Sequence, residues 1–258
     1  MDIIMQEIKI LLSGAMGRLG RAITESASES GCRIVAGIDV NQTAGEIPVY
    51  QSPLDLADDI SVDCIIDCSH HSAIGPLLEY AVGHNLPIVV CTTGHTEEET
   101  ALIHSAAEKI PVFFSRNMSV GINLLIQLAK QAAEVLGRDF DVEIIERHHN
   151  RKLDAPSGTA LMIADAVAPI LGDDTEYTYE RQSRREPRRK NEIGIHSVRG
   201  GTIVGEHEIM FAGCDEVITI QHSAASREVF ARGALRAARY LVGKPKGFYN
   251  METLVSGE

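Results

Sequence analysis

The chain has 258 residues, of which 44% are hydrophobic and 23% are charged. This composition is typical of ordinary globular proteins and excludes a fibrous or disordered chain. Asp and Glu outnumber Lys and Arg by 36 to 24, and the resulting net charge of −12 repels nucleic-acid phosphates. No apolar run approaches the ~20 residues that cross a bilayer, and the first residues show no signal or transit peptide. We therefore expect a cytoplasmic protein that binds neither membrane nor nucleic acid.

Five cysteines, at positions 32, 64, 68, 91 and 214, are scattered along the chain. Three residues separate Cys64 from Cys68 in an apolar run, a spacing that fits neither a zinc pair nor a redox pair. We interpret the cysteines as small, reduced core residues and expect no metal site.

The first half of the chain alternates short β-branched runs with helical patterns. Strands are expected at residues 8–13, 33–39, 64–69, 88–92 and 112–115, and helices at 19–30, 73–84 and 97–109. Such an alternation predicts a parallel sheet with helices on both faces. We therefore expect a Rossmann-type α/β dinucleotide-binding domain in residues 1–119.

After residue 117 the pattern changes. We expect helices at 120–136 and 158–171, strands at 141–148 and within 195–221, and a final helix at 227–242 followed by a short tail. This pattern predicts a central α+β domain in residues 120–228, with residues 229–258 returning to complete the first domain.

A basic segment without periodicity, residues 181–190, holds six of the 24 basic residues. It is either a solvated surface loop or a loop that attracts a dicarboxylate or covers a cofactor. Arg199, which two glycines follow, belongs either to a turn at a strand edge or to a substrate site. The sequence leaves both questions open.

A glycine-rich turn follows the first expected strand and opens the first helix. Its glycines, Gly14, Gly17 and Gly20, have the spacing G-x-x-G-x-x-G. Gly14 permits a tight turn, Gly17 lets the backbone approach a pyrophosphate, and Gly20 allows close packing. The phosphates of a dinucleotide would then lie at the helix N-terminus, where free N–H groups favour negative charge.

Asp39 stands at the end of the second expected strand, where a carboxylate accepts hydrogen bonds from ribose hydroxyls. The next residue is Val40 and not a basic residue that would pair with a 2′-phosphate. This pattern favours NADH, while Arg18 in the glycine-rich turn keeps NADPH possible.

Two later segments follow the fourth and fifth expected strands, at the edge where this architecture binds its cofactor. One holds Cys91, Thr92 and Thr93, and the other runs from Ser115 through Arg116 and Asn117 to Met118. They are either ordinary turns or the surroundings of a nicotinamide.

The densest polar cluster, ERHHNRKLDAPSGT, spans residues 146–159. His148 or Lys152 can donate a proton near neutral pH, and Lys152 also attracts an anion. Residues 157–159 begin a helix, whose N–H groups and hydroxyls form a cradle for a carboxylate. The cluster therefore indicates a proton donor beside an anion site, suited to the reduction of a small carboxylate.

Several of these motifs resemble those of the dihydrodipicolinate reductase (4-hydroxy-tetrahydrodipicolinate reductase) family of the diaminopimelate route to lysine. The similarity runs almost from end to end, through GAMGRLGR, TTG, SRNMSVGIN, ERHHNRKLDAPSGTA, IHSVRGGTIVGEHEIMF and GKPKGFYNM. It implies a dinucleotide-binding domain, a central substrate domain whose sheet builds a homotetramer, and a small dicarboxylate substrate.

The resemblance also implies roles for individual residues. His148 would be the proton donor and Lys152 the partner that binds or protonates the substrate, while His149, Gly158 and Thr159 would hold a substrate carboxylate. The cofactor would be bound by Gly14, Ala15, Met16, Gly17, Arg18, Leu19, Asp39, Cys91, Thr92, Thr93, Ser115, Arg116, Asn117 and Met118. The implied reaction delivers hydride to ring C4 of an unsaturated cyclic imine and a proton to C3.

Two other functions fit the same scaffold. A phosphorylating aldehyde dehydrogenase needs an activated cysteine, and only Cys91 lies near the expected cofactor crevice. A non-catalytic dinucleotide sensor usually carries a DNA-binding or partner module, and no such module is visible in the sequence.

Overall fold

The structure, a computed structural model, describes residues 7–41, 47–57 and 59–257. The chain divides into two compact units, which are described separately below. The first unit contains Met1–Val120 and Arg227–Glu258, and the second contains Gly121–Ser226. No helix within the described ranges is long and apolar enough to span a bilayer.

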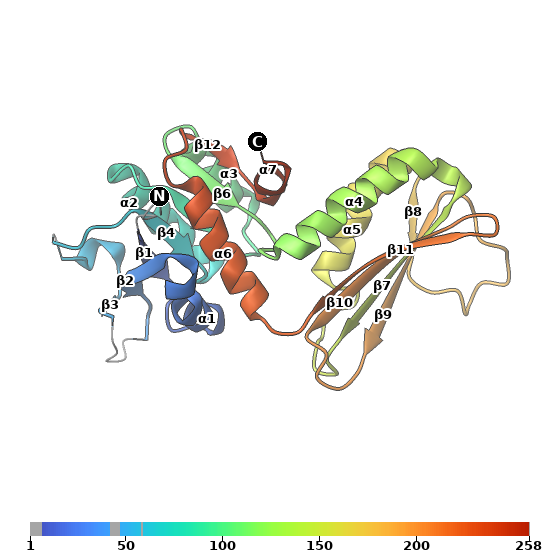
Figure 1. Cartoon of the computed structure of the whole chain (residues 1–258), viewed down its shortest axis with the longest axis horizontal. Helices are drawn as coiled ribbons and strands as arrows, with labels where there is room; N and C mark the ends of the chain where they lie inside the picture. The colour runs from blue at the N-terminus through green and yellow to red at the C-terminus, as the bar shows by residue number, and fades with distance from the viewer. Residues whose placement is uncertain (1–6, 42–46, 58, 258) are drawn as a thin grey trace, which may run out of the picture. The chain divides into compact units, whose positions relative to one another are not determined.

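The first unit is built on a seven-stranded parallel sheet in the order β12-β6-β5-β4-β1-β2-β3 (Figure 1). Its strands are β1 (Ile8–Ser13), β2 (Cys32–Ile38), β3 (Val49–Tyr50), β4 (Cys64–Asp67), β5 (Ile88–Val90), β6 (Pro111–Phe114) and β12 (Gly247–Tyr249). Adjacent strands pair in parallel throughout. Their carboxyl ends therefore meet at one edge, where the predicted cofactor segments begin.

Helices cover both faces of this sheet. One face packs against α1 (Arg18–Ser26), α6 (Glu228–Leu241) and α7 (Met251–Ser256), and the other against α2 (Ile74–Gly83) and α3 (Glu97–Ala107). Figure 1 shows that α6, although more than 200 residues later in the chain, lies beside α1. The C-terminal segment is thus part of the dinucleotide-domain core.

The second unit is a five-stranded mixed sheet in the order β11-β10-β7-β9-β8 with helices packed on one face. Its elements are α4 (Val120–Leu136), β7 (Asp141–His148), α5 (Gly158–Leu171), β8 (Glu176–Thr178), β9 (Glu192–Arg199), β10 (Gly205–Ala212) and β11 (Val217–Ala224). Apolar side chains of α4 and α5 pack on alternate residues of β7, β9 and β10. Short 3-10 helices at Ser28–Ser30, Pro53–Asp55, His71–Ala73 and Gly137–Asp139 complete the described secondary structure.

The predicted fold class is confirmed, and the bounds predicted for β1, α4, β7 and α5 agree with the structure residue for residue. The short tail after the last helix contains two elements that were not predicted, β12 and α7. The strands β3 and β8 were not predicted either. All three unpredicted strands have two or three residues and lie at sheet edges, so their pairing partners and not their own sequence patterns stabilise them.

The basic segment 181–190 is exposed for most of its length, but ion pairs connect it to the second sheet. Arg181 contacts Glu143 at 3.0 Å and Glu192 at 2.8 Å, and Arg188 contacts Glu143 and Asp141 at 3.0 Å each. These ion pairs give two of its arginines a structural role at the sheet.

Candidate active site

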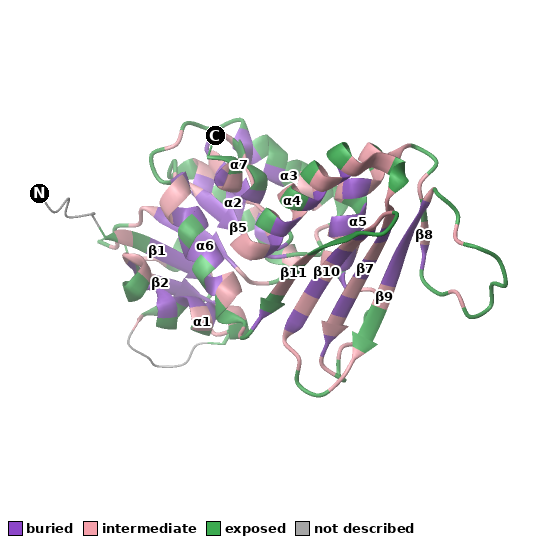
Figure 2. Ribbon diagram, turned by 45° about the vertical axis from the view of Figure 1, so that its right-hand side comes forward, coloured by how far each residue is buried: buried purple, intermediate pink, exposed green. Residues whose placement is uncertain are grey.

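Strand β7 directs the central residues of the candidate site toward the helix-covered face of the second sheet. Its residues alternate strictly between intermediate and buried, as Figure 2 shows in pink and purple. Because side chains of a strand alternate between faces, Glu146 and His148 share the buried face with the apolar residues Val142 and Ile144. Two ionisable groups are thus placed in a face that is otherwise core.

Glu146 is the most enclosed polar group of the site, with no exposed side-chain surface. Its carboxylate accepts a hydrogen bond from His148 Nδ1 at 2.5 Å and two from the Arg199 guanidinium at 2.7 Å each. A fourth hydrogen bond comes from the backbone N–H of Ser157 at 3.1 Å. A buried carboxylate is stable only when it is paired in this way.

Burial and neighbouring charges shift the pKa of Glu146 in opposite directions. Burial alone raises the pKa of this carboxyl, but hydrogen bonds from Arg199 and His148 outweigh it and hold the pKa at about 2. Glu146 is therefore ionised at every pH at which the protein would work.

Ser157 caps the helix α5 at the end where the sequence predicts the carboxylate cradle. Its Oγ accepts from the backbone N–H of Ala160 at 3.2 Å and lies 3.0 Å from His207 Nε2. Gly158, the first residue of the helix, is exposed, and a Cβ there would meet nothing within 4 Å. The N-terminus of α5 is thus held by the hydrogen bonds of Ser157, and the space beside its first residue, Gly158, is free of other described atoms.

His207, on β10, lies next to His148, and the centroids of the two rings are 5.2 Å apart. Burial, and secondarily the neighbouring His148, lower the pKa of His207 to about 3. The imidazole is therefore neutral near pH 7.

Lys152 lies in the loop between β7 and α5, and its Nζ pairs with Asp154 Oδ2 at 2.8 Å. The hydrogen bond from Lys152 lowers the pKa of Asp154. Arg199 donates to the backbone carbonyl of Asp154 at 2.6 Å, so it holds this loop as well as Glu146. Arg199 is the last residue of β9, and its guanidinium belongs to the buried network around Glu146.

The sequence pointed to His148 and Lys152, left the place of Arg199 open, and assigned no role to Glu146 or His207. One signal was present for Glu146, because a single residue separates it from His148 in a strictly alternating strand, and this spacing places both side chains on one face. Arg199 and His207 reach the site through strand pairing, which leaves no trace in local sequence.

The glycine-rich turn of the first unit has the conformation that a phosphate loop requires. Gly14 has φ +80°, and a Cβ there would lie 2.6 Å from the backbone oxygen of Cys68, so no other residue fits. Asp39 Oδ2 accepts from the backbone N–H of Met16 at 3.0 Å, which ties the turn to the end of β2. Val40 is 83% exposed. Of the other predicted residues, Ala15 is buried, Leu19 is half-buried, and Gly17 and Arg18 are exposed.

Within each of the two segments after β5 and β6, buried residues and one exposed residue occur together. Cys91, Thr92, Ser115, Asn117 and Met118 are buried, whereas Thr93 and Arg116 are exposed. Ser115 Oγ donates to the Asn117 carbonyl at 2.9 Å, and Asn117 Oδ1 accepts from the N–H of Ser119 at 2.9 Å. Met118 packs into the core beside α6, so its side chain is a support of this edge.

Two buried oxygens at this edge fit a polar ligand. Thr92 Oγ1 and Asp67 Oδ2 have no hydrogen-bond partner among the described residues. Buried polar atoms normally have one. Together with the turn at Gly14, they fit a bound dinucleotide.

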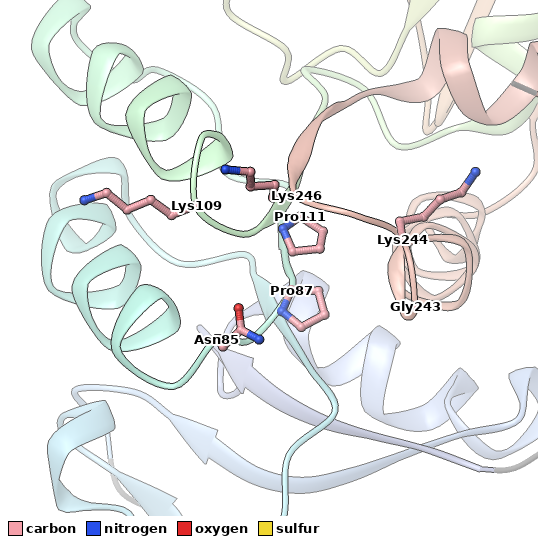
Figure 3. A pocket seen from close by; sticks show the side chains of 7 residues that line it. All are labelled: Asn85, Pro87, Lys109, Pro111, Gly243, Lys244 and Lys246. Atoms are coloured by element: carbon pink, nitrogen blue, oxygen red, sulfur yellow. The ribbon is translucent and has the colours of Figure 1, made fainter.

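A hollow of about 430 Å³ lies at the opposite edge of this sheet, beside the amino ends of β5 and β6. Its lining residues include Lys109, Lys244 and Lys246, and Figure 3 shows Lys109 and Lys244 pointing away from each other. The Lys244 ammonium lies over the Tyr240 ring, 4.4 Å from its centroid. The lysines do not converge, and the hollow is not part of the candidate site.

The chain matches known proteins over nearly its whole length. A family model described as the N-terminus of dihydrodipicolinate reductase matches residues 8–118, and one described as the C-terminus matches residues 121–255. The chain belongs to the dihydrodipicolinate reductase family. It is 50% identical to the 4-hydroxy-tetrahydrodipicolinate reductase of Caldanaerobacter subterraneus subsp. tengcongensis, covering 96% of this chain and 98% of the relative. The enzyme of the same name from Clostridium tetani is 44% identical, with 96% and 97% covered.

Solved structures agree with this membership. The dipicolinate-bound dihydrodipicolinate reductase from Paenisporosarcina sp. TG-14 has a TM-score of 0.81 at 25% identity, covering 96% of this chain and 100% of that one. An amine dehydrogenase from Mycobacterium smegmatis has a TM-score of 0.62 at 9% identity and shares the fold alone. The resemblance drawn from the sequence motifs is confirmed, and this member of the family is an oxidoreductase of lysine biosynthesis.

The structure also bears on the aldehyde dehydrogenase alternative. Cys91 is 8% exposed, and burial raises the pKa of its thiol well above the ordinary value. Nucleophilic cysteines instead have lowered pKa values in partly exposed, electropositive surroundings. Cys91 is therefore a core residue, and both this alternative and the sensor give way to the reductase family.

Proposed function

We propose that this chain is a cytoplasmic enzyme that reduces 4-hydroxy-tetrahydrodipicolinate to tetrahydrodipicolinate with NADH, in the diaminopimelate route to lysine. The family and the reaction follow from the two family models and the curated relatives. The observation that carries the site is the histidine–glutamate–arginine network beside the open N-terminus of α5. The solved relative that binds dipicolinate supports a cyclic dicarboxylate as the ligand.

The residues of the second unit divide the work of binding and protonation. His149, Gly158 and Thr159 hold one substrate carboxylate at the N-terminus of α5, where the N–H groups and helix dipole favour an anion. The Lys152 ammonium, which pairs with Asp154 in this structure, pairs with the substrate instead when the substrate binds. Its positive charge then offsets the negative charge of the bound dicarboxylate. His148 delivers the proton to ring C3.

The reaction balances as one hydride and one proton. Loss of water from the 4-hydroxy compound leaves a ring double bond conjugated with the imine, and the nicotinamide, when bound, supplies hydride for ring C4. The proton from His148 is added to C3, and the C=N bond of the ring remains in the product. Solvent restores the proton to His148.

NADH is the expected cofactor, because the residue after Asp39 is an exposed valine and not a cation. The cofactor-binding residues are those of the glycine-rich turn, Asp39 and the two segments at 91–93 and 115–118. Asp39 retains a lone pair on each oxygen for the ribose hydroxyls after accepting from Met16 and Asn41. Arg18 is exposed and available for a 2′-phosphate, which keeps NADPH as a slower alternative.

We further propose a homotetramer built through the second sheet. The face of this sheet that α4 and α5 leave uncovered includes Val198 and Val217, which are 44% and 58% exposed. Sedimentation velocity tests the assembly: a monomer at micromolar concentration would refute it.

Oxidation of NADH and of NADPH, followed by absorbance, tests the activity. The substrate is formed in place by dihydrodipicolinate synthase from pyruvate and aspartate semialdehyde. We expect oxidation that requires the synthase and is faster with NADH. Lys152→Ala should abolish turnover and leave NADH binding unchanged, whereas folded wild-type protein that binds NADH without turnover would refute the enzymatic function.

A further inference from the structure

One buried carboxylate contacts every part of the proposed proton-donating site. Glu146 accepts from His148, from the N–H of Ser157 at the start of α5, and from Arg199. Arg199 in turn binds the carbonyl of Asp154, in the loop that carries Lys152. The proton donor, the carboxylate cradle and the lysine loop are thus joined through a single side chain.

The geometry also selects one nitrogen of His148 for catalysis. Nδ1 lies 2.5 Å from Glu146, and because the ionised carboxylate can only accept, Nδ1 carries a hydrogen in both protonation states. Nε2 has no hydrogen-bond partner among the described residues, and a Cβ at Gly205 would lie 3.2 Å from it. Glycine at position 205 therefore keeps the space beside Nε2 clear.

We propose that Glu146 and Arg199 are positioning residues of the reductase: Glu146 holds His148 so that Nε2 is its proton-donating atom, and Arg199 keeps Glu146 ionised and fastens the lysine loop. The inference rests on the proposed function, in which His148 is the proton donor. Glu146 does not relay the proton, because two hydrogen bonds from one guanidinium hold both of its oxygens.

The network places one anion in direct contact with His148. Glu146 lies 2.5 Å from Nδ1, whereas Arg199 contacts Glu146 and the carbonyl of Asp154. His207 is hydrogen-bonded to Ser157. Among the described residues, Glu146 is therefore the group that fixes the hydrogen on Nδ1.

The variant Glu146→Gln keeps the shape of the side chain and removes its charge. The glutamine amide can donate as well as accept, so NMR of labelled histidine should show the hydrogen of neutral His148 on Nδ1 in the wild type and shared between both ring nitrogens in the variant. Because Nε2 is then no longer fixed as the proton donor, kcat should fall at least tenfold while KM changes little.

Glu143→Gln is the matched control. Glu143 lies on the same strand and also contacts a histidine, His196 at 2.7 Å, and two arginines, but its side chain is on the opposite face of the sheet. It should change stability and leave both the position of the His148 hydrogen and kcat as in the wild type. Equal kcat values for Glu146→Gln, Glu143→Gln and wild type would overturn the inference.

Arg199→Lys provides a second test should Glu146→Gln fail to fold. Lysine keeps a positive charge but lacks the fork that binds two oxygens, so we expect a KM raised at least tenfold with an almost unchanged pH profile. An unchanged KM would overturn the role of Arg199. Failure of the proposed function is distinguishable, because wild-type protein would then show no turnover while the NMR spectra would still report which nitrogen of His148 carries the hydrogen.

Discussion

His207 makes the stability of the second unit depend on pH in a way that can be calculated. Its imidazole is 5% exposed and lies between Ser157 and His148. Burial lowers its pKa from 6.5 to about 3. As the pH falls, the His207 imidazole therefore takes up a proton in the unfolded chain before it does so in the folded protein. Because the folded pKa lies below the unfolded one, this contribution to stability is complete above pH 6.5 and is lost as the pH falls toward 3.

The size of the effect follows from the two pKa values. At pH 7 the folded imidazole is neutral and only about a quarter of the unfolded chains are protonated at this residue. At pH 5 the pH is about 1.5 units below the pKa of the unfolded imidazole, while the folded one is still neutral. At 1.36 kcal/mol for each unit, acidification from pH 7 to pH 5 should cost the wild type about 2 kcal/mol through His207 alone. His207→Asn should lack this part of the loss.

Urea unfolding followed by circular dichroism at the two pH values measures the difference. His84→Asn is the control, because His84 is exposed on the surface of the first unit and its loss should leave the wild-type dependence unchanged. His207→Asn will be less stable than wild type at pH 7, since it loses a buried hydrogen bond. If His207→Asn and wild type lost the same free energy between pH 7 and pH 5, the assignment of a neutral buried His207 would be refuted.

Three further predictions concern the first unit. Gly233→Ala should lower the melting temperature and weaken NADH binding, because the new methyl group would overlap the backbone oxygen of Met118. The control is Gly75→Ala, where a Cβ meets nothing within 4 Å. This variant should instead stabilise the protein by up to about 1 kcal/mol. Val40→Arg should shift the ratio of NADPH to NADH oxidation rates at least tenfold toward NADPH by pairing with the 2′-phosphate, and an unchanged ratio would contradict the proposed place of the ribose. Iodoacetamide should leave Cys91 unmodified and the activity intact, as mass spectrometry and the coupled assay would show, because burial raises the pKa of that thiol.

The elements that could be predicted from the sequence are those whose own residues determine their structure. Helix α4 and strand β7 have periodicities of 3.6 and 2 over eight or more residues, and both were predicted with their observed bounds. The strand β12 has three residues and pairs with β6, from which more than 130 residues separate it in the chain. No local pattern predicts such a strand, because its stability comes from a partner that the sequence does not specify locally.

The candidate site divides along the same line. His148, Lys152 and the start of α5 lie within one continuous segment, where residue types and a capping serine indicate the chemistry. The roles of Arg199 and His207 depend on strand register: Arg199 pairs with His148 across β9 and β7, and His207 pairs with Glu146 across β10 and β7. The contacts of Arg199 and His207 therefore could not be predicted without the pairing of the strands.

Register therefore matters for function here as well as for packing. Arg199 stands opposite His148 and reaches back two residues, along the same face, to Glu146. A slip of one residue between β7 and β9 would turn the arginine to the other face of the sheet and leave a buried carboxylate without its cation, at a cost of about 3 to 5 kcal/mol. The ion pair that positions the proton donor thus also opposes the misregistered sheet, so the same contacts that hold His148 in place favour the one strand alignment in which it can act.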